Sequence, residues 1–252
     1  MSLGLGASLS KTGLTTPGII TDNLAIKHNY SAGVVVPVSD GAYLGGGDGT
    51  NDRITISSTA FSVHDTPHSF AFWAKRNVTN ATHAVFGNHA NGGTHGGAYS
   101  HIIFLSTNGY LQLETDVDGD RIEGVVHTVD TNWHHYAITI GDSGASAAIY
   151  QDGVSLTVQG DSTIALDNDI TLDLIGATNN TGSSYEIDGY LCNLGIWDAK
   201  LTQPQVKSIM WKSYADLTST ESEDLIHWWA LDEGEGITAN DSKGSLNGTV
   251  VI

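Results

Sequence analysis

The sequence predicts an all-β fold, a sandwich of two sheets with one short helix. Short runs that alternate apolar and polar residues recur along the chain, which is the period-2 pattern of half-buried strands. Turn signals separate these runs at regular spacing, as they do in sandwiches. The composition agrees, with 30 glycines and only 15% charged residues among 252 positions. A chain of this length can bury a sizeable core as one domain.

The clearest strand pattern lies at residues 132–140. Alternation places Trp133, His135, Ala137 and Thr139 on one face of this strand, and His134, Tyr136, Ile138 and Ile140 on the other. A second strand follows within residues 145–154. We expect the pair to close on Asp152-Gly153, because these residue types tolerate the positive φ angles of a tight turn.

The other strands follow from residue 41 onward. They are expected at 41–45, 53–57, 69–76, 83–87, 99–106, 110–116, 121–126, 156–158, 171–176, 190–197, 225–231 and 248–252.

One helix is predicted on the C-terminal side of the sandwich. Thr202 is a good N-cap, and Gln205 three residues later completes a capping-box pattern. Proline is tolerated in the first turn, where Pro204 falls. The apolar stripe that follows consists of Val206, Ile209, Met210 and Tyr214.

Residues 1–40 differ from the rest, because isolated apolar residues stand between Gly, Ser, Thr and Pro without a sustained period. Such a segment cannot bury enough surface to fold alone. It is either a flexible tail or an extended arm that orders against a partner. We expect an arm for docking and assembly, followed by one domain at 41–252. The apolar residues of this arm are Leu3, Leu5, Leu9, Leu14, Ile19, Ile20, Leu24 and Ile26.

Charge and cysteine content exclude several classes of function. The formal net charge of −18 argues against nucleic acid and anionic membranes as partners, since both require a basic surface. Cys192 is the single cysteine, so an internal disulfide framework is excluded. No stretch approaches the ~18 apolar residues of a membrane span. We also expect no secretory signal, because the first residues lack a basic region and a long apolar run.

Five segments carry a family resemblance. They are the hairpin at 133–154, Gly47-Asp48-Gly49-Thr50-Asn51-Asp52-Arg53-Ile54, Ser69-Phe70-Ala71-Phe72-Trp73-Ala74-Lys75, the segment 187–202 around Gly195-Ile196-Trp197, and Leu225-Ile226-His227-Trp228-Trp229-Ala230-Leu231-Asp232-Glu233-Gly234 with Asp241-Ser242-Lys243-Gly244. Together, residues 41–252 resemble the laminin-G/pentraxin-like, concanavalin A-like jelly-roll family. The resemblance implies a two-sheet jelly roll. In many relatives the last motif precedes the sandwich, so here it implies a permuted edge or pairing with the arm.

The arm has its own resemblance. Ser2-Leu3-Gly4-Leu5-Gly6 and the following residues to Tyr30 are similar to the N-terminal arms of structural proteins from tailed bacteriophages. This implies a non-enzymatic virion protein, a capsid decoration or a tail- or fibre-associated component, assembled in the host cytoplasm. Its implied partners are other capsid or tail proteins and further copies of itself.

The alternative interpretation is a lectin-like module that recognises a glycan on a host cell surface, since this fold often presents loop aromatics to sugars. Most tryptophans, Trp133 among them, fall in strand motifs and are expected in the core. The aromatic residues left as candidate glycan contacts are Tyr99, Tyr110, Tyr185 and Trp211.

No catalytic residue is assigned. Glycoside hydrolases on this fold carry a Glu-x-Asp-x-x-Glu motif. Its two glutamates supply the pair of carboxyl groups, about 5–5.5 Å apart, that retaining hydrolysis needs. Here Glu186-Ile187-Asp188 begins the pattern, but Leu191 stands where the second Glu would be. We therefore predict that the protein is not an enzyme.

Calcium is the cofactor to consider, because it prefers oxygen-rich loops. Relatives often hold an ion through an Asp at the position of Cys192, and a thiol is a poor ligand for a hard cation. Asp48, Asn51 and Asp52 remain as the candidate ligands.

Overall fold

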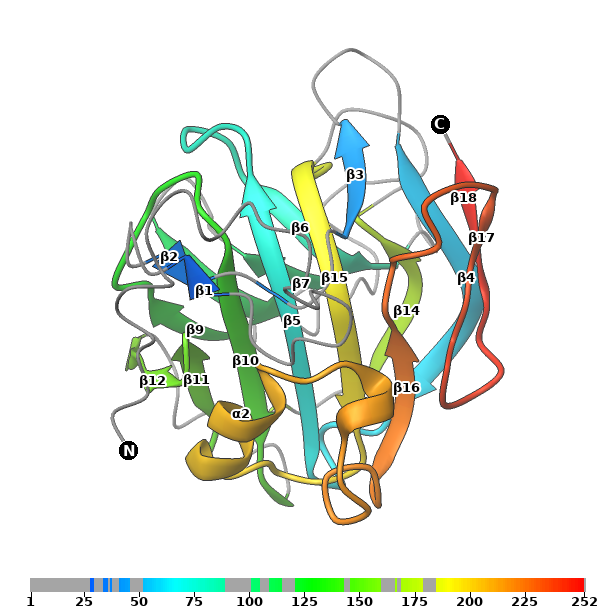
Figure 1. Cartoon of the computed structure of the whole chain (residues 1–252). Helices are drawn as coiled ribbons and strands as arrows, with labels where there is room; N and C mark the ends of the chain where they lie inside the picture. Colours follow the sequence, from blue (N-terminus) through cyan, green and yellow to red (C-terminus); the bar gives the residue numbers. More distant parts are fainter. Residues whose placement is uncertain are drawn as a thin grey trace, which may run out of the picture.

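The computed structural model describes residues 28–29, 34–35, 37, 41–45, 52–88, 101–104, 109–114, 121–142, 146–159, 166, 169–178 and 185–251. They form two antiparallel sheets packed face to face, with one short helix against the outside (Figure 1). The predicted all-β sandwich is confirmed. The apolar residues of the predicted arm, Leu3 to Ile26, lie outside the described residues.

The first sheet, called sheet B, has the strand order β12-β11-β10-β5-β15-β16. Its strands are β5 (His68–Arg76), β10 (His134–Ile140), β11 (Ala148–Gln151), β12 (Val154–Ser155), β15 (Asp188–Trp197) and β16 (Leu225–Trp229). The short strand β3 (Ala42–Gly45) also pairs with β15. The long strand β15 therefore shares one side between two partners, β3 along residues 188–191 and β16 along residues 194–197.

The second sheet, sheet C, has the order β13-β9-β8-β7-β6-β14-β4-β18-β17. Its strands are β4 (Arg53–Phe61), β6 (His83–Gly87), β7 (His101–Phe104), β8 (Tyr110–Glu114), β9 (Arg121–Val125), β13 (Thr157–Gln159), β14 (Ile170–Ile175), β17 (Thr238–Ala239) and β18 (Gly248–Val251). The C-terminal motif thus supplies β16 to sheet B and β18 beside β4 to sheet C. The motif therefore pairs with strands of the sandwich in both sheets, and the expected pairing with the arm concerns residues that lie mostly outside the described ranges.

A separate ribbon precedes the sandwich. β1 (His28–Asn29) pairs with β2 (Val34–Val35). Within the described ranges neither strand joins sheet B or sheet C. Both fall in the predicted arm, whose boundary at residue 40 stays a prediction.

The core lies between the sheets and follows the predicted alternation. Tyr136, Ile138 and Ile140 of β10 belong to this core, while Ala137 packs on the opposite face of sheet B. Large side chains that are fully buried here include Phe72 and Phe86. Burying each such ring contributes about 2–3 kcal/mol relative to leaving it exposed.

One local prediction was wrong. Asp152-Gly153 joins β11 to β12 rather than β10 to β11, although φ is positive at both residues (51° and 72°) as expected. The strand predicted at 156–158 is found one residue later, as β13, after the chain has crossed from β12 in sheet B to sheet C. Leu156, at the crossing, is 4% exposed, so its burial fixes the point of crossing.

The predicted helix is α2 (Gln203–Ile209). The N–H of Thr202 donates to Oε1 of Gln205 at 2.8 Å, as the capping-box pattern indicated. The helix is shorter than the apolar stripe, because it ends at Met210 and Tyr214 begins the 3₁₀ turn η3 (Tyr214–Asp216). Across the described ranges no helix has the length and hydropathy needed to cross a bilayer.

Candidate functional site

The outer face of sheet B is divided between a covered part and an open part. Helix α2 lies across one end of β10, β5 and β15 (Figure 1). Val206 and Ile209 of the helix pack there against Ala71, Ala137 and Trp197. The helix does not reach the opposite end of this face, where β5 finishes and β15 begins.

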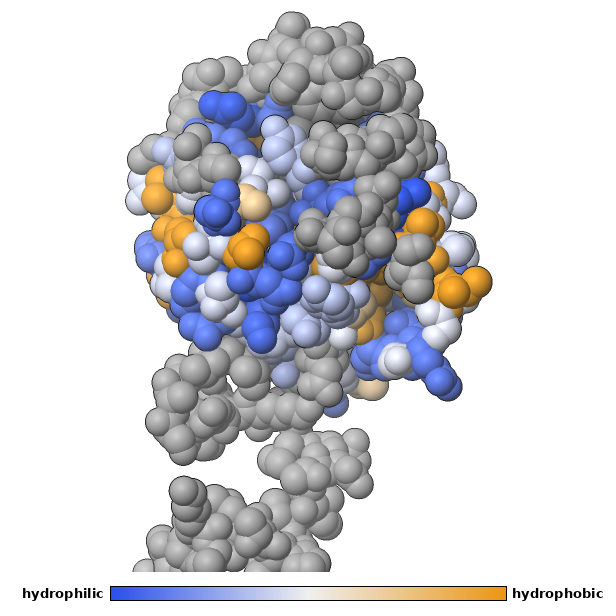
Figure 2. Space-filling model, turned by 90° about the horizontal axis from the view of Figure 1, so that it is seen from above, coloured by the Kyte–Doolittle hydropathy of each residue, from blue (hydrophilic) through white to orange (hydrophobic). Residues whose placement is uncertain are grey.

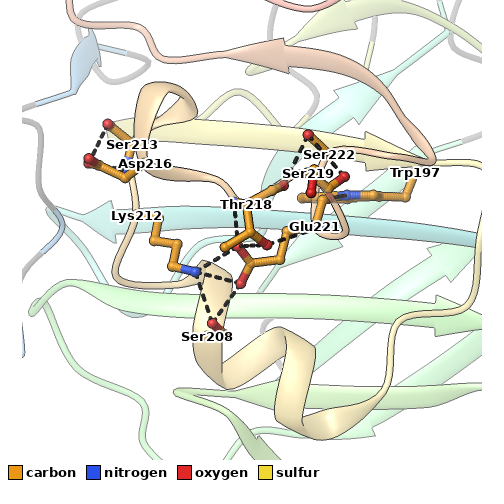
Figure 3. Close-up of polar contacts among 9 residues, drawn as sticks. All are labelled: Trp197, Ser208, Lys212, Ser213, Asp216, Thr218, Ser219, Glu221 and Ser222. Carbon is orange, nitrogen blue, oxygen red and sulfur yellow. Dashed lines mark hydrogen bonds and ion pairs between the residues drawn. The ribbon is translucent and has the colours of Figure 1, made fainter.

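A partly buried ion pair holds the covering segment in place (Figure 3). The ammonium of Lys212 lies 2.6 Å from the carboxylate of Glu221, which also accepts bonds from Ser208 and Thr218. Burial acts to raise the pKa of Glu221, but the hydrogen bonds from Lys212, Ser208 and Thr218 outweigh it and lower the pKa to about 2. The backbone oxygen of Glu221 accepts the indole N–H of Trp197 at 2.8 Å, so the segment is fastened to β15.

Aromatic side chains gather at the open end. Tyr43 of β3 and Tyr190 of β15 are register partners with ring centroids 5.0 Å apart, and Tyr43 is 53% exposed. Trp133 lies 6.0 Å from Tyr190 on its other side. The ammonium of Lys75 stands 5.3 Å from the centroid of the Tyr190 ring. We call Tyr43, Trp133, Tyr190 and Lys75, with Trp211 at the border to the helix, the aromatic face.

The aromatic face rests on a buried layer. Trp73, Cys192 and Met210 form a small cluster on which Trp133 and Trp211 pack. The indole N–H of Trp73 donates to the backbone oxygen of Met210 at 2.8 Å. Cys192 is fully buried, so its side chain contributes to packing as a small apolar group.

Trp133 can lie close to β15 because a glycine precedes β3. Gly41 has φ of +74°, which other residues rarely adopt. A Cβ on Gly41 would come within 3.0 Å of the Trp133 ring and 2.6 Å of the Leu191 backbone oxygen. The glycine therefore sets both the turn into β3 and the position of the indole.

The loop that carries Trp133 is held by two buried side chains. Gln151 accepts the N–H groups of His127 and Thr128 at 2.8 and 3.1 Å, and donates to the Thr128 oxygen at 3.0 Å. Nε of Arg76 donates to the backbone oxygen of Asp130 at 3.0 Å. Residues 127–130 are thus tied to β11 and β5, which fixes where β10 starts.

His134 lies between two carboxylates on the inner side of the sheet. Its Nδ1 is 2.7 Å from Asp152 and its Nε2 is 3.0 Å from Asp130. Burial acts to lower the pKa of His134, but hydrogen bonds to Asp152 and Asp130 prevail and raise it. Since an ionised carboxylate only accepts, this geometry favours a ring with both nitrogens protonated. The neighbouring His135 faces the other way, against Trp73, and burial lowers its pKa to about 4.

Three of the four predicted glycan contacts are described, and the structure places them in different parts of the sandwich. Trp211 borders the aromatic face, with its ring centroid 5.9 Å from that of Trp73. Tyr110 lies in β8 of sheet C, and Tyr185 is 44% exposed just before β15. Tyr99 lies outside the described residues.

Sequence reasoning missed Tyr43, Tyr190 and Trp133 as members of a surface. Trp133 was expected in the core, but it is only partly buried. The available signal was that Trp133 and Tyr190 lie at the ends of their strand patterns. Side chains on the outer face of a sheet are less often buried by a packed element when they lie near the end of a strand.

The predicted calcium ligands are only partly described. Asp48 and Asn51 lie outside the described residues. Oδ2 of Asp52 accepts the N–H of Gly45 at 2.9 Å, which fastens the start of β4 to the end of β3. In the described part of the chain no group of three His, Cys, Asp or Glu side chains is arranged to hold a metal ion. Calcium binding stays a prediction.

Glu186 and Asp188, which begin the hydrolase-like pattern, contact residues in or directly after the neighbouring strands. Oδ1 of Asp188 accepts a bond from Nδ2 of Asn77 at 2.7 Å, and the backbone oxygen of Glu186 lies 3.3 Å from Nδ1 of His83. Leu191, at the position of the second Glu, is buried in the core. Asp188 is the first residue of β15, and its carboxylate and backbone oxygen hold Asn77 just after the end of β5.

Seen from above, the sandwich presents a mixed surface (Figure 2). Hydrophilic residues occupy the middle of the described surface in this view, and apolar residues gather at its flanks. With a formal net charge of −18, this surface belongs to a strongly acidic protein.

Comparison with known proteins identifies the fold family. A family model described as the concanavalin A-like lectin/glucanases superfamily matches residues 48–207, which is more than half of the chain. No curated protein sequence matches.

Solved structures are similar to the chain at low sequence identity. One is a Bacteroides ovatus protein whose name proposes carbohydrate binding, at 16% identity and a TM-score of 0.53 over 80% of this chain. The chain spans 58% of that protein's length. A second is a heptameric pentraxin from Limulus polyphemus, at 15% identity and a TM-score of 0.47, with 67% of this chain and 80% of that one covered. A third is a carbohydrate-binding module of a Ruminococcus gnavus sialidase bound to α2,6 sialyllactose, at 14% identity and a TM-score of 0.45, with 63% of this chain and 96% of that one covered.

Proposed function

The chain belongs to the concanavalin A-like lectin/glucanase superfamily, and we propose that it is a carbohydrate-binding module whose glycan lies on the aromatic face of sheet B. The observation that carries this proposal is the adjacent pair Tyr43 and Tyr190, with rings 5.0 Å apart at the end of sheet B that helix α2 does not cover. Aromatic side chains with one apolar face and a polar group suit a ligand that is itself partly apolar and partly hydroxylated.

The geometry suits a pyranose or furanose ring. The C–H face of a sugar would pack on the exposed ring of Tyr43, while the phenol groups offer hydrogen bonds to sugar hydroxyls. Trp133 on the far side of Tyr190 extends the surface to a second sugar unit. The buried layer of Trp73 and Cys192 supports Trp133 before binding, which reduces the entropy that binding must overcome.

The test is a glycan screen of the full chain, followed by calorimetry on the glycan that binds most tightly. Tyr43→Ala is expected to weaken that binding at least about 10-fold, as truncation of a central aromatic contact does. Ile237→Ala is the control, since it removes an exposed apolar side chain outside the aromatic face. Equal affinities of wild type and Tyr43→Ala would contradict the assignment of the site.

The proposed module is not an enzyme. This is supported by Leu191, which stands buried where the hydrolase-like pattern would need a second carboxylate. A broad panel of polysaccharides is therefore expected to yield no reducing ends. Release of reducing ends that is abolished by Glu186→Gln would overturn this part of the proposal.

The biological setting that we propose is the virion of a tailed bacteriophage, to which residues 1–40 would dock the module. The proposal is supported by the sequence of the arm and by the ribbon β1–β2, whose strands pair with each other. The localisation, the capsid or tail partners and the homo-oligomer all belong to this proposal. A chain starting at residue 41 is expected to fold and to bind glycan but not to enter the particle. Normal incorporation of that chain would exclude the docking role.

A further inference from the structure

Lys75 holds a distinctive place in the aromatic face. It is the register partner of Tyr190 in the pairing of β5 with β15, and it follows Trp73 by two residues on the same side of the sheet. Its Nζ stands 5.3 Å from the Tyr190 ring centroid, within the range of a cation–π contact. The side chain is partly exposed, so its ammonium can reach a molecule lying on Tyr43 and Tyr190.

The described carboxylates do not form an ion pair with Lys75. The chain has 28 Asp and Glu against 10 Lys and Arg, so a cation has many carboxylates available. Lys212 and Arg121 each pair with a glutamate, at 2.6 and 3.1 Å. For Lys75, as for Lys243, no carboxylate of the described residues lies within ion-pair distance, and Lys75 differs from Lys243 in standing over an aromatic ring.

The acidic residue that shares this side of β15 does not neutralise Lys75. Asp188 is two residues from Tyr190, and its carboxylate accepts a hydrogen bond from Asn77 at 2.7 Å. The ammonium of Lys75 thus lies over an aromatic ring, and its N–H groups do not donate to any carboxylate of the described residues. An ammonium group has three donors and no acceptor, so it selects an acceptor that carries negative charge.

We propose that the glycan bound on the aromatic face is acidic, and that Lys75 recognises its carboxylate or sulfate group while the sugar ring packs on Tyr43 and Tyr190. This inference rests on the proposed function and adds the charge class of the ligand. It also explains how a protein with a net charge of −18 would bind an anion, since recognition depends on one local cation rather than on the overall field.

The experiment compares matched oligosaccharides by calorimetry with the full chain. One pair is a uronic-acid oligosaccharide and its carboxyl-reduced form, and the other is a sulfated oligosaccharide and its desulfated form. Wild type is expected to bind the acidic member of one pair about 10-fold more tightly than the neutral member, the usual effect of a hydrogen bond to a charged group. The pair that shows the difference identifies the anion as a carboxylate or a sulfate.

Three variants complete the experiment. Lys75→Gln is expected to remove the preference while keeping the wild-type affinity for the neutral form, and Lys75→Arg is expected to keep the preference. Lys243→Gln is the control with the same change in net charge, because the ammonium of Lys243 donates to the backbone oxygen of Ser222 outside the aromatic face. It should bind as wild type does.

The outcomes separate the two proposals. Equal binding of acidic and neutral forms, with a loss in Tyr43→Ala, would overturn the charge preference and leave glycan binding intact. Equal loss of both forms in Lys75→Gln would also overturn it. Failure of wild type to bind any oligosaccharide would remove both proposals. Self-association of the chain that Tyr43→Ala abolishes would show that a second copy occupies the face, and would likewise remove both.

Discussion

The imidazole of His134 lies 2.7 Å from the carboxylate of Asp152, eighteen residues later in the chain. The same carboxylate accepts the backbone N–H of His135 at 2.9 Å. One aspartate of the Asp152-Gly153 turn thus fixes the start of β10, directly beside Trp133 of the aromatic face. The turn residue that the sequence singled out has a second role, as an anchor for a neighbouring strand.

Asp152→Asn is therefore expected to make stability depend less on pH. The pKa of His134 is raised in the folded protein, so its contribution is complete below its unfolded pKa near 6.5 and is lost as the pH rises through the folded value. We expect the variant to lose about 1 kcal/mol relative to wild type at pH 5.5, and less at pH 8.5. Urea unfolding at both pH values measures this, with Asp232→Asn, an exposed aspartate, as control. A loss that is the same at both values would contradict the role of the protonated ring.

Glu221→Gln is expected to change how the free energy of unfolding depends on pH in the acid range. The pKa of Glu221 is lowered to about 2, so its contribution is present above the unfolded value near 4.5 and disappears as the pH falls toward 2. At pH 7 the variant should unfold about 2 kcal/mol more easily, because Lys212 loses its charged partner. The difference between the two proteins should close between pH 4.5 and 2 in denaturant titrations. Glu223→Gln, an exposed neighbour, should change little at any pH.

Asp241 gives the C-terminal motif its shape. Its buried carboxylate accepts the N–H groups of Trp228, Gly244 and Leu246 at 2.9–3.0 Å and lies 2.6 Å from Nδ1 of His227. Asp241→Ala leaves these donors without an acceptor and is expected to cost about 3 kcal/mol in the free energy of unfolding. Asp241→Asn keeps one acceptor oxygen, so its melting temperature in thermal denaturation should lie between those of wild type and Asp241→Ala. An alanine variant as stable as the asparagine variant would show that the hydrogen bonds contribute little.

Gly189→Ala tests the close approach of β15 to β5. A Cβ at this position would overlap the backbone oxygen of Lys75 and lie 2.8 Å from the Cα of Arg76, so the two strands would have to separate. We expect a loss of about 2–3 kcal/mol and weaker glycan binding, because Lys75 moves. Gly234→Ala is the control, since nothing lies within 4 Å of its added Cβ and only its φ of +74° opposes the change. Differential scanning calorimetry of both variants makes the comparison, and equal losses would argue against a tight contact at Gly189.

Sequence periodicity predicted the strands well, because each depends mainly on which of its faces is buried. The two faces of residues 134–140 follow from alternation alone. The capping residues Thr202 and Gln205 fixed the start of α2 for a similar local reason. The end of the helix was less predictable, because Met210 and Tyr214 continue the apolar stripe after the backbone has left the helix.

The partners of each strand were harder to predict, because they depend on contacts far apart in the chain. The Asp152-Gly153 signal indicated a turn but not which strands the turn would join. The aromatic face was missed for the same reason. Tyr43 and Tyr190 are 147 positions apart, and they meet only because β3 pairs with β15 in a register that no local pattern contains.

The C-terminal strands have a consequence for how this protein is kept from aggregating. β16 covers part of one side of β15 in sheet B, and β18 covers β4 in sheet C, so one terminal segment closes an edge in each sheet. An exposed edge offers unpaired N–H and C=O groups to other chains. Proteolysis before Leu225 would open both edges at once, and the cleaved protein would be prone to add strands from its neighbours. The last part of the chain thus protects both sheets from intermolecular pairing.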